Sequence, residues 1–399
     1  MKCSSKVISA MRITILFLIV LMVINCNIEN SYSSKLDEYF VNSSIPAAMM
    51  GYVDNNGVRK WKAFGPSKWG KTDTISKDNL FRIHSLAKAI ISVGALQLVE
   101  KGLITLDEPL NKLMPEMISI PILNENGELI KSDSEITLHH LLTHTAGFGY
   151  DFTSTALKNF NTEDWKYEDM PRLFEPGKRW HYGTSTNWVG KLIEKLTGKT
   201  LEIYLRENIT GPLKMNSTWY NVPSNLEDKI VSWGTRDSSK GFLEFALKPK
   251  SDASFNKGAS LFSSPNDYMT FLECMLNDGK FQGGQLLKPE TMKLIFENQL
   301  PEDMSLNYDI PKNEIPNTVD GFFDESDKFS FAWAIENNDT EKVRNKGAAY
   351  WSGAANLYYT LDKSEGIAIV YFTQFFPFND KESYDFYRLY EKEVYFNHK

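Results

Sequence analysis

The segment that most constrains this chain is an apolar stretch that opens with a serine and a lysine three residues apart. It reads FRIHSLAKAIISVGALQLVEKG over residues 81–102, and its apolar residues recur close to helical spacing until Gly102. Because residues i and i+3 share one face of a helix, the hydroxyl of Ser85 and the amine of Lys88 can meet. A serine beside a lysine at the start of a buried helix is typical of a nucleophile and its base. The segment therefore predicts a buried helix that carries a reactive serine.

A second S-x-x-K match shows that the tetrapeptide alone is a weak signal. Ser254 and Lys257 lie in SDASFNKGAS, a polar stretch that contains glycine and has no helical period. We interpret this second match as a coincidence, and the choice of Ser85 rests on the helical context around it.

The composition of the chain indicates a large buried core and argues against one class of partner. The 399 residues are 42% hydrophobic and 13% aromatic, which is ample for one or two domains. The net charge is −7, and neither a basic cluster nor a low-complexity tract is present. A nucleic-acid partner is therefore not expected.

The histidine-rich segment TLHHLLTHTAGF does not have the pattern of a metal site. It contains His139, His140 and His144, but no carboxylate or cysteine accompanies them at a zinc spacing. We expect these histidines to pack and to form hydrogen bonds, and the sequence predicts neither a metal ion nor a cofactor.

The first 25 residues have the pattern of a secretory signal peptide. Three basic residues precede ITILFLIVLMVI, a run over positions 13–24 that is apolar except for one threonine, and the polar stretch NIENSYSSK follows. This run is too short to span a membrane and has the length of a signal-peptide core. We predict a signal peptide over residues 1–25, a linker over 26–35, and export to the periplasm or cell envelope.

The apolar run ends in VINC, and Cys26 resembles the lipidated cysteine of bacterial lipoprotein signals. Asn25 departs from the small residue that this pattern prefers just before the cysteine. Lipid on Cys26 would anchor the exported protein to a membrane. Cys274 would then be the unmodified thiol of the processed chain, so we expect no intramolecular disulfide.

Strand-like and helical segments alternate along the rest of the chain. AAMMGYVDNNGVRKWKAFG reads as two strands around an Asn56-Gly57 turn, and the serine-bearing helix follows. LITLDEPLNKLMPEM then reads as a turn that leads to a short helix. From about Ile136 to Leu247 the sequence favours helices and loops, including ITLHHLLTHTAGF and TNWVGKLIEKLTG.

Strands return in the last third of the chain. Ser264 and Pro265 open an amphipathic helix, after which KFSFAWAIEN, YWSGAANLYYTLD and GIAIVYFTQFF alternate or run apolar. A polar-faced helix, NDKESYDFYRLYEKEVYF, closes the chain, and no internal repeat is visible. We therefore predict one mixed α/β lobe over residues 36–130 and 250–399, interrupted by a mainly helical lobe over about 131–249.

Five blocks of the sequence resemble, in order, the serine β-lactamase and penicillin-binding-protein superfamily, on its class C side and most closely its carboxylesterases. They are FRIHSLAKAI with VEKGLITLDEPLNKLMPE, ITLHHLLTHTAGF, FEPGKRWHYGTSTNWVGKLIEKLTG, KGASLFSSPNDYMTF, and YWSGAANLYYTLDKSEGIAIVYFTQ. The resemblance covers roughly residues 36–390. It implies an α+β fold of the β-lactamase/DD-peptidase type, with a central antiparallel sheet flanked by helices, a mainly helical lobe, and the active site between the two.

The resemblance assigns roles to residues in these blocks. Ser85 matches the nucleophile of the family, and Lys88 matches the lysine one turn later. Burial and the positive end of the helix would lower the pKa of this lysine, which must be neutral to accept a proton. Tyr182, in HYGTSTN, matches the tyrosine of the Y-x-N motif, whereas Thr184 stands at the substrate-binding position where many relatives have asparagine. The sequence leaves open whether Lys88 or Tyr182 is the base.

A third motif lies on the expected strand beside the nucleophile. β-Lactamases and peptidases have K-T-G there, whereas this chain has Trp351-Ser352-Gly353, the W-x-G form of the esterase relatives. Trp351 and Gly353 are therefore expected to bind substrate, the glycine because the substrate approaches the strand closely. The resemblance further implies an oxyanion hole made by the backbone N–H groups of Ser85 and Ala354.

Together these features predict a serine hydrolase that forms an acyl-serine intermediate with a small-molecule ester or amide, first of all a carboxylesterase on short-chain esters. A D-aminopeptidase, a DD-carboxypeptidase or a weak β-lactamase on the same scaffold is the alternative, followed by an inactive binding or sensor protein. No G-x-S-x-G elbow is present, so the α/β-hydrolase fold is disfavoured. Nothing in the sequence indicates an oligomeric state.

The walls of the substrate pocket are expected to come from residues 148–170, 220–256 and 300–325. Aromatic residues in the first two stretches would line an apolar acyl pocket or simply pack, namely Tyr150, Phe152, Trp165, Tyr167 and Trp233. His144 and Gly147, in HTAGF, are expected to shape the turn that leads into the helical lobe.

Overall fold

The computed structural model describes residues 35–163, 165–237, 241–246, 257–306, 318–319, 322–324, 326–338 and 343–398. The predicted signal peptide, Cys26 and Ser254 lie outside the described residues, so export and lipid attachment stay predictions. Within the described part, no helix combines the length and the apolar character needed to cross a membrane.

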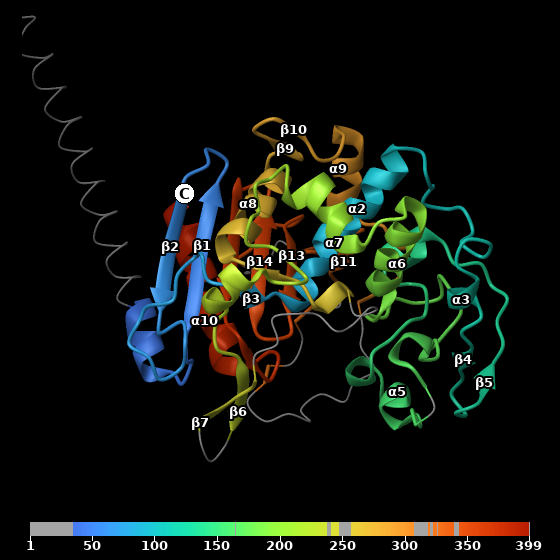
Figure 1. Ribbon diagram of the computed structural model, residues 1–399, viewed down its shortest axis with the longest axis horizontal. Coiled ribbons are helices and arrows are strands. Elements are labelled where there is room, and N and C mark those ends of the chain that lie inside the picture. Colours follow the sequence, from blue (N-terminus) through green and yellow to red (C-terminus); the bar gives the residue numbers. More distant parts are fainter. Residues whose placement is uncertain are drawn as a thin grey trace, which may run out of the picture.

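A seven-stranded sheet forms the centre of the molecule (Figure 1). Its strands run in the order β11-β12-β13-β14-β15-β1-β2, and every neighbouring pair is antiparallel. The strands are β1 (Ala48–Asp54), β2 (Arg59–Phe64), β11 (Lys328–Phe329), β12 (Ala334–Ile335), β13 (Ala349–Gly353), β14 (Leu357–Asp362) and β15 (Ile367–Phe372). Because β1 pairs with β15, the sheet joins the two ends of the described chain.

The first two strands form the hairpin that the sequence predicts around Asn56-Gly57. Asp54 Oδ1 accepts hydrogen bonds from the backbone N–H groups of Asn56 and Val58, each at 2.9 Å. Gly57 has a φ of 78°, in the left-handed region that glycine adopts without steric cost. These contacts are local, which explains why the turn could be predicted from the sequence.

Helices cover both faces of the sheet, and the side chains of β14 alternate between them. The covering helices are α8 (Pro265–Leu276) on one face and α10 (Lys381–His398) on the other. The ring of Tyr359 lies 5.7 Å from that of Tyr268 on α8. Tyr358 and Thr360 point to Tyr387 on α10, through stacked rings at 4.9 Å and a 2.6 Å hydroxyl contact. The strand is thus buried on both sides, as its near-continuous apolar sequence indicates.

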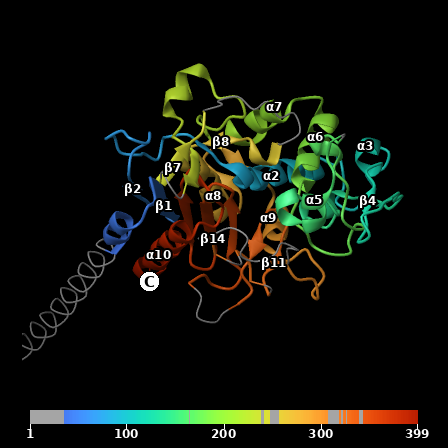
Figure 2. The same ribbon diagram turned by 90° about the horizontal axis from the view of Figure 1, so that it is seen from below.

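A group of helices lies to one side of the sheet, at the right of Figure 1, and Figure 2 shows the same arrangement from below. It comprises α3 (Pro115–Ile118), α4 (Leu138–Leu142), α5 (Thr155–Asn159), α6 (Ser185–Thr197) and α7 (Leu201–Leu205). The serine-bearing helix α2 (Ala87–Glu100) packs against α6 and α7. Gly94 allows this approach, because a Cβ there would already lie 3.3 Å from Tyr204 and Leu205. The predicted α+β architecture is confirmed.

A small sheet forms where the sequence favours helices and loops. β6 (Gly234–Asp237) pairs with β7 (Gly241–Glu244) and, in parallel, with β16 (Phe375–Phe376), which follows the central sheet. The rings of Phe242 and Phe375 pack edge to face with centroids 5.2 Å apart. The prediction of helices and loops is wrong for these strands, because each is only a few residues long and β6 also pairs with β16 from a distant part of the chain.

The remaining described elements are short. They are β3 (Phe81–Arg82) paired with β8 (Phe262–Ser263), β4 (Ile122–Leu123) with β5 (Leu129–Ile130), β9 (Lys280–Phe281) with β10 (Gly284–Gln285), and α9 (Pro289–Phe296). The β3–β8 pair matters most for function, because β3 leads directly into the segment that carries Ser85.

Candidate active site

Ser85 lies in a tight turn between β3 and α2. Residues His84–Leu86 form a 3₁₀ turn, η1, and α2 follows directly. The chain is anchored just before this turn, where the N–H of Ile83 donates to the carbonyl of Leu261 at 2.9 Å. His84 has a φ of 48°, in the left-handed region that residues other than glycine rarely adopt. Strained backbone of this kind gathers at functional sites, which makes the half-buried Ser85 next to it a candidate.

Three of the residues predicted from the sequence meet at this turn. The hydroxyl of Tyr182 donates to Ser85 Oγ at 2.6 Å, and Lys88 Nζ donates to the same atom at 3.1 Å. Tyr182 comes from the segment just before α6, so the fold brings it to Ser85 from a different part of the chain. Ser85 is therefore within hydrogen-bond distance of two groups that can exchange a proton with it.

Burial determines the chemistry of Lys88. The residue is 3% exposed, and burial lowers the pKa of its amine to about 7. A substantial fraction of the amine is therefore neutral at neutral pH and able to accept a proton. Burial is the cause of this shift, and a contribution from the positive end of the helix stays a prediction.

The pKa of the Tyr182 hydroxyl is raised well above its usual value, chiefly by burial. Interactions with the hydroxyl of Ser85 and the indole of Trp351 act in the opposite direction and do not prevail. Trp351 Nε1 forms no hydrogen bond of standard geometry in the part of the chain that the structure describes. Tyr182 is therefore protonated at neutral pH and acts as a donor to Ser85.

Aromatic rings surround Trp351 on β13. Its ring centroid lies 5.2 Å from that of Tyr182, 5.1 Å from that of Phe323 and 5.4 Å from that of Phe329. Trp351 is 3% exposed. It stands in place of the K-T-G lysine, and its indole brings one N–H donor and no charge to the site. Direct contact of Trp351 with substrate stays a prediction.

β13 passes close to the turn that carries Ser85, and Gly353 makes this approach possible. A Cβ at position 353 would lie 2.7 Å from the carbonyl oxygen of Ile83 and 3.1 Å from Leu86. Glycine is thus required by the protein's own backbone, a different reason from the approach of a substrate. Ala354 directly follows this contact, and its backbone N–H together with that of Ser85 stays our prediction for the oxyanion hole.

Thr184 and Asn187 lie at the start of α6, just after Tyr182. Thr184 is buried, and its side chain does not cap the helix, so its contact with substrate stays a prediction. Asn187, which the sequence analysis does not single out, accepts a hydrogen bond from the N–H of Gly258 at 2.9 Å. Its Nδ2 is buried without a hydrogen-bond partner among the described residues. In the sequence, the signal for Asn187 is its place one helical turn after Thr184, the position that holds asparagine in many Y-x-N motifs.

A turn that the sequence analysis sets aside lies against the lysine. η6 (Lys257–Ala259) begins at the lysine of the second S-x-x-K match, and the carbonyl of Gly258 accepts a hydrogen bond from Lys88 Nζ at 3.1 Å. A Cβ on Gly258 would lie 2.8 Å from Asn187 Oδ1 and 3.3 Å from Lys88 Nζ, so the contact requires glycine. The block KGASLFSSPNDYMTF contributes to the family resemblance, but no motif rule points to this glycine.

His144 supports the segment of Tyr182. Its Nδ1 accepts a hydrogen bond from the N–H of Gly183 at 3.4 Å, and its ring centroid lies 4.9 Å from that of Tyr182. Burial holds the pKa of this imidazole well below its usual value, so the ring is neutral. His144 and Gly147 both have positive φ, and a Cβ on Gly147 would lie 2.3 Å from the carbonyl of Phe174. Both residues therefore shape the HTAGF turn.

The two other histidines of this segment have structural contacts. His140 Nδ1 accepts a hydrogen bond from the N–H of Thr137 at 3.2 Å, and the ring of His139 packs edge to face on Phe331. Across the described ranges, no three histidine, cysteine, aspartate or glutamate side chains are arranged to hold a metal ion.

Aromatic side chains predicted for the pocket border the site from two segments. Tyr150 lies 5.5 Å from Tyr182 between ring centroids and stacks on Phe152, which is 60% exposed. Trp233 contacts Phe376, whose ring also packs on His84 beside Ser85.

The other two predicted aromatics differ from each other. Trp165 packs edge to face on Phe160, with ring centroids 5.2 Å apart. Tyr167 is exposed and close enough to Tyr182 to influence its pKa.

Comparisons with known proteins connect this geometry to a family. The family model described as Beta-lactamase matches residues 33–392. Monacolin J acid methylbutanoyltransferase from Aspergillus terreus is 30% identical over 344 residues, which cover 80% of this chain and 82% of that protein. Lovastatin esterase from Penicillium rubens is 29% identical over 257 residues, which cover 58% of this chain and 62% of the esterase.

Solved structures give the same result for the fold. A mutant of simvastatin synthase from Aspergillus terreus has a TM-score of 0.80 and 28% identity, and the match covers 91% of this chain and 94% of that one. EstCE1, described as a hydrolase with promiscuous acyltransferase activity, has a TM-score of 0.71 and 16% identity, with 93% and 100% covered. At the latter identity the likeness concerns the fold alone.

Proposed function

Because the chain belongs to the beta-lactamase family, we propose that it is an acyl-serine enzyme, in which Ser85 takes an acyl group from an ester and passes it to water or to an alcohol. Family membership also confirms the superfamily and the fold type that the sequence resembles. The observation that carries the proposal is the contact of Ser85 Oγ with both Lys88 Nζ and the Tyr182 hydroxyl, at 3.1 and 2.6 Å.

In the proposed acylation, the neutral amine of Lys88 removes the proton of Ser85 as Oγ attacks the ester carbonyl. The pKa of about 7 makes the neutral amine available, whereas Tyr182 is held protonated and would first have to lose its own proton. This difference favours Lys88 as the base and Tyr182 as the group that passes a proton to the leaving alcohol. The backbone N–H groups of Ser85 and Ala354 would stabilise the oxyanion.

The second half of the cycle releases the acyl group. After the ester C–O bond breaks, the alcohol has left with the proton that Ser85 lost, and the acyl group is bound to Ser85 Oγ. A hydroxyl of water or of a second alcohol then attacks the acyl carbonyl and gives its proton to the Tyr182–Lys88 pair. The bond between the acyl carbon and Ser85 Oγ breaks, and the pair returns the proton to Oγ, which restores the Ser85 hydroxyl. Hydrolysis and acyl transfer differ only in this second nucleophile.

Relatives of both kinds support these two activities as candidates. The chain is similar to a protein named as a methylbutanoyltransferase and to one named as an esterase. Our first candidate is a carboxylesterase on short-chain esters, and the second is transfer of an acyl group to a small alcohol. The exposed ring of Phe152, stacked on Tyr150 beside Tyr182, favours an apolar acyl group in either case.

Labelling with a fluorophosphonate probe is expected to modify Ser85 and no other serine. Its Oγ lies beside the buried amine of Lys88, which increases its nucleophilicity. Intact-mass analysis should show one adduct, and peptide mapping should place it at Ser85. Ser85→Ala should abolish the adduct, whereas Ser254→Ala, in the second S-x-x-K match, should retain it. An adduct at another serine, or none on the folded protein, would contradict the proposed nucleophile.

An alcohol added to the ester assay separates the two candidate activities. With p-nitrophenyl butyrate and increasing 1-butanol, we expect butyrate to remain the main product, because water is the nucleophile of the first candidate. Chromatography of butyrate and butyl butyrate measures the partition, with Ser85→Ala as the control for uncatalysed transfer. Butyl butyrate in excess of the alcohol-to-water ratio would favour the acyltransferase candidate instead.

A further inference from the structure

The turn η6 (Lys257–Ala259) is held by four side chains from distant parts of the chain. Each of its three residues takes part. The partners are Glu194 and Tyr220 at Lys257, Asn187 at Gly258 and Arg82 at Ala259, at 2.7, 2.9, 2.9 and 3.2 Å. Because these four contacts come from separate parts of the chain, they fix the position of η6 relative to α2 and α6.

The same turn covers the amine of Lys88. The carbonyl of Gly258 accepts a hydrogen bond from Lys88 Nζ at 3.1 Å. A Cβ built on Gly258 would lie 3.3 Å from Nζ and 3.5 Å from Cε, so the backbone of the turn closes over the end of the lysine side chain. The position of η6 therefore affects both the burial and the orientation of the amine.

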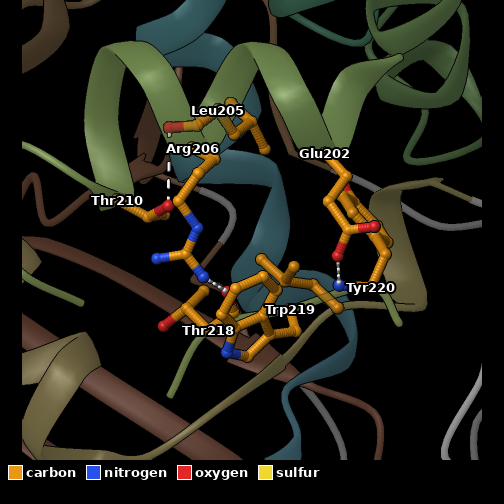
Figure 3. A pocket seen from close by; sticks show the side chains of 8 residues that line it. Glu202, Leu205, Arg206, Thr210, Thr218, Trp219 and Tyr220 are labelled. Carbon is orange, nitrogen blue, oxygen red and sulfur yellow. Dashed lines mark hydrogen bonds between the residues drawn. The ribbon is translucent and has the colours of Figure 1, made fainter. Parts of the chain in front are cut away.

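Tyr220 joins η6 to α7. It is 7% exposed, and its hydroxyl donates to the carbonyl of Lys257 at 2.9 Å. Its own backbone N–H donates to Glu202 Oε1 on α7 at 2.9 Å, which Figure 3 shows as a dashed line. Tyr220 is thus fixed at both its backbone and its hydroxyl.

A small cavity lies beside Tyr220, and Figure 3 shows the residues that line it, including Arg206, Thr218 and Trp219. The guanidinium of Arg206 lies over the ring of Trp219, and its Nη groups donate to the carbonyls of Met215 and Thr218 at 3.1 and 3.0 Å. These contacts fix the segment that leads into Tyr220. The guanidinium of Arg206 is bound to carbonyls of the protein itself, so it is not available to bind a ligand in the cavity.

We propose that Tyr220 is a positioning residue for Lys88, which acts by holding η6 in place. With one N–H bound to the carbonyl of Gly258, a neutral amine can direct its lone pair at the hydroxyl of Ser85. With the turn in place, the amine is also shielded from water. The inference rests on the proposed function, because it assigns this arrangement to a lysine that works as a base.

The charges of Tyr182, His84 and His144, which lie around Lys88, do not change near neutral pH. The rings of Tyr182 and Tyr150 lie 5.0 and 5.7 Å from Nζ, and Tyr182 is held protonated by burial, which raises its pKa. Burial lowers the pKa of His84 to about 3 and that of His144 well below its usual value, so both rings are neutral. The charged side chains at η6 are that of Lys257, which belongs to the turn, and those of its partners Arg82 and Glu194.

The variant Tyr220→Phe tests the proposal because it removes one hydroxyl and no charge. NMR of protein labelled with carbon-13 at lysine Cε follows the titration of Lys88 directly, and the absence of the signal in Lys88→Met identifies it. We expect the midpoint of Lys88 to move upward, toward that of an ordinary lysine, by about 0.5 pH unit or more as water reaches the amine. The acid limb of kcat/KM for p-nitrophenyl butyrate should move in the same direction.

The variant Tyr204→Phe is the matched control. Tyr204 is also buried, and its hydroxyl donates to the carbonyl of Gly94 at 3.0 Å and lies 3.3 Å from Gln97 Oε1, both on α2. Both variants lose a buried hydrogen bond to a backbone carbonyl and should lose a similar amount of thermal stability. Only Tyr220→Phe should move the midpoint of Lys88.

The possible results separate this inference from the proposed function. An unchanged midpoint in Tyr220→Phe, or an equal shift in Tyr204→Phe, would overturn the role of Tyr220 and leave the esterase proposal intact. A midpoint that moves as expected in a protein without acyl-transfer or ester activity would support the role of Tyr220 and contradict the proposed function.

Discussion

Lys88→Met is expected to lower kcat for ester hydrolysis by about two orders of magnitude or more, the usual scale for a general acid–base group. The amine of Lys88 lies 3.1 Å from Ser85 Oγ, and its pKa of about 7 suits proton transfer at neutral pH. Methionine is flexible and similar in length, so the variant removes the base and keeps most of the packing. Turnover of p-nitrophenyl butyrate measures the effect. Lys101→Met, at the exposed end of α2, should leave kcat unchanged.

The same variant is expected to raise the stability of the folded protein. The pKa of Lys88 is about 7 when folded and usually 10.5, so the unfolded state binds more protons between these values. Wild-type stability therefore rises with pH across this window, and the full cost of burying the charged amine is present below it. Lys88→Met lacks this cost. Its free energy of unfolding should exceed that of the wild type most at about pH 6 and less as the pH approaches 10.5.

Denaturant unfolding of both proteins at two pH values measures this difference. Equal stability of the two proteins at the lower pH would show that the amine is not buried in solution.

Tyr182→Phe distinguishes the roles of the two groups that contact Ser85. We expect kcat to fall about as much as in Lys88→Met, because the proton path to the leaving alcohol is interrupted. The acid limb of kcat/KM near pH 7 should remain, since it reports Lys88. If the limb instead disappeared in Tyr182→Phe and persisted in Lys88→Met, Tyr182 would be the base.

Part of this site could be predicted because its contacts are local or belong to a motif. Ser85 and Lys88 are three residues apart at the start of one helix, so no tertiary information is needed to pair them. Tyr182 is 97 residues away from Ser85 and was reached through the family resemblance, since a tyrosine before a helix is not distinctive by itself. The hairpin at Asn56-Gly57 was predictable for the same local reason as the serine–lysine pair.

The support around Lys88 could not be predicted because it is made of single contacts between distant segments. Asn187, Tyr220 and Gly258 each contribute one hydrogen bond to η6 or to the lysine, and none of these residue types indicates such a role in sequence. The pairing of β6 with β16 illustrates the same limit, since both strands are short and lie far apart in the chain. Hydrophobic periodicity identifies which segments are buried and leaves open which of them meet.

Nitrocefin is expected to be a much poorer substrate than p-nitrophenyl butyrate. β-Lactams carry a carboxylate, and the lysine of a K-T-G motif supplies a cation to meet it. Here Trp351 occupies that position, 3% exposed and packed against Phe323 and Phe329. Loss of a charge-assisted hydrogen bond costs on the order of 1.5–3 kcal/mol, or about ten- to a hundredfold in binding. Lys346 is exposed in the turn before β13, and we do not expect it to replace that cation. Comparison of kcat/KM for the two substrates checks this.

The methyl ester of nitrocefin separates carboxylate recognition from the general reactivity of the lactam. If no cation meets the carboxylate, esterification should leave kcat/KM nearly unchanged, whereas a drop of about tenfold would show a charge-assisted contact. Arg82 would then be the residue to replace, because it lies three positions before Ser85 with its guanidinium 5.8 Å from the ring of Trp233. Loss of nitrocefin turnover in Arg82→Met, with p-nitrophenyl butyrate still hydrolysed, would place anion recognition on β3 instead of β13. In that case the replacement of lysine by Trp351 would change the orientation of the substrate rather than its class.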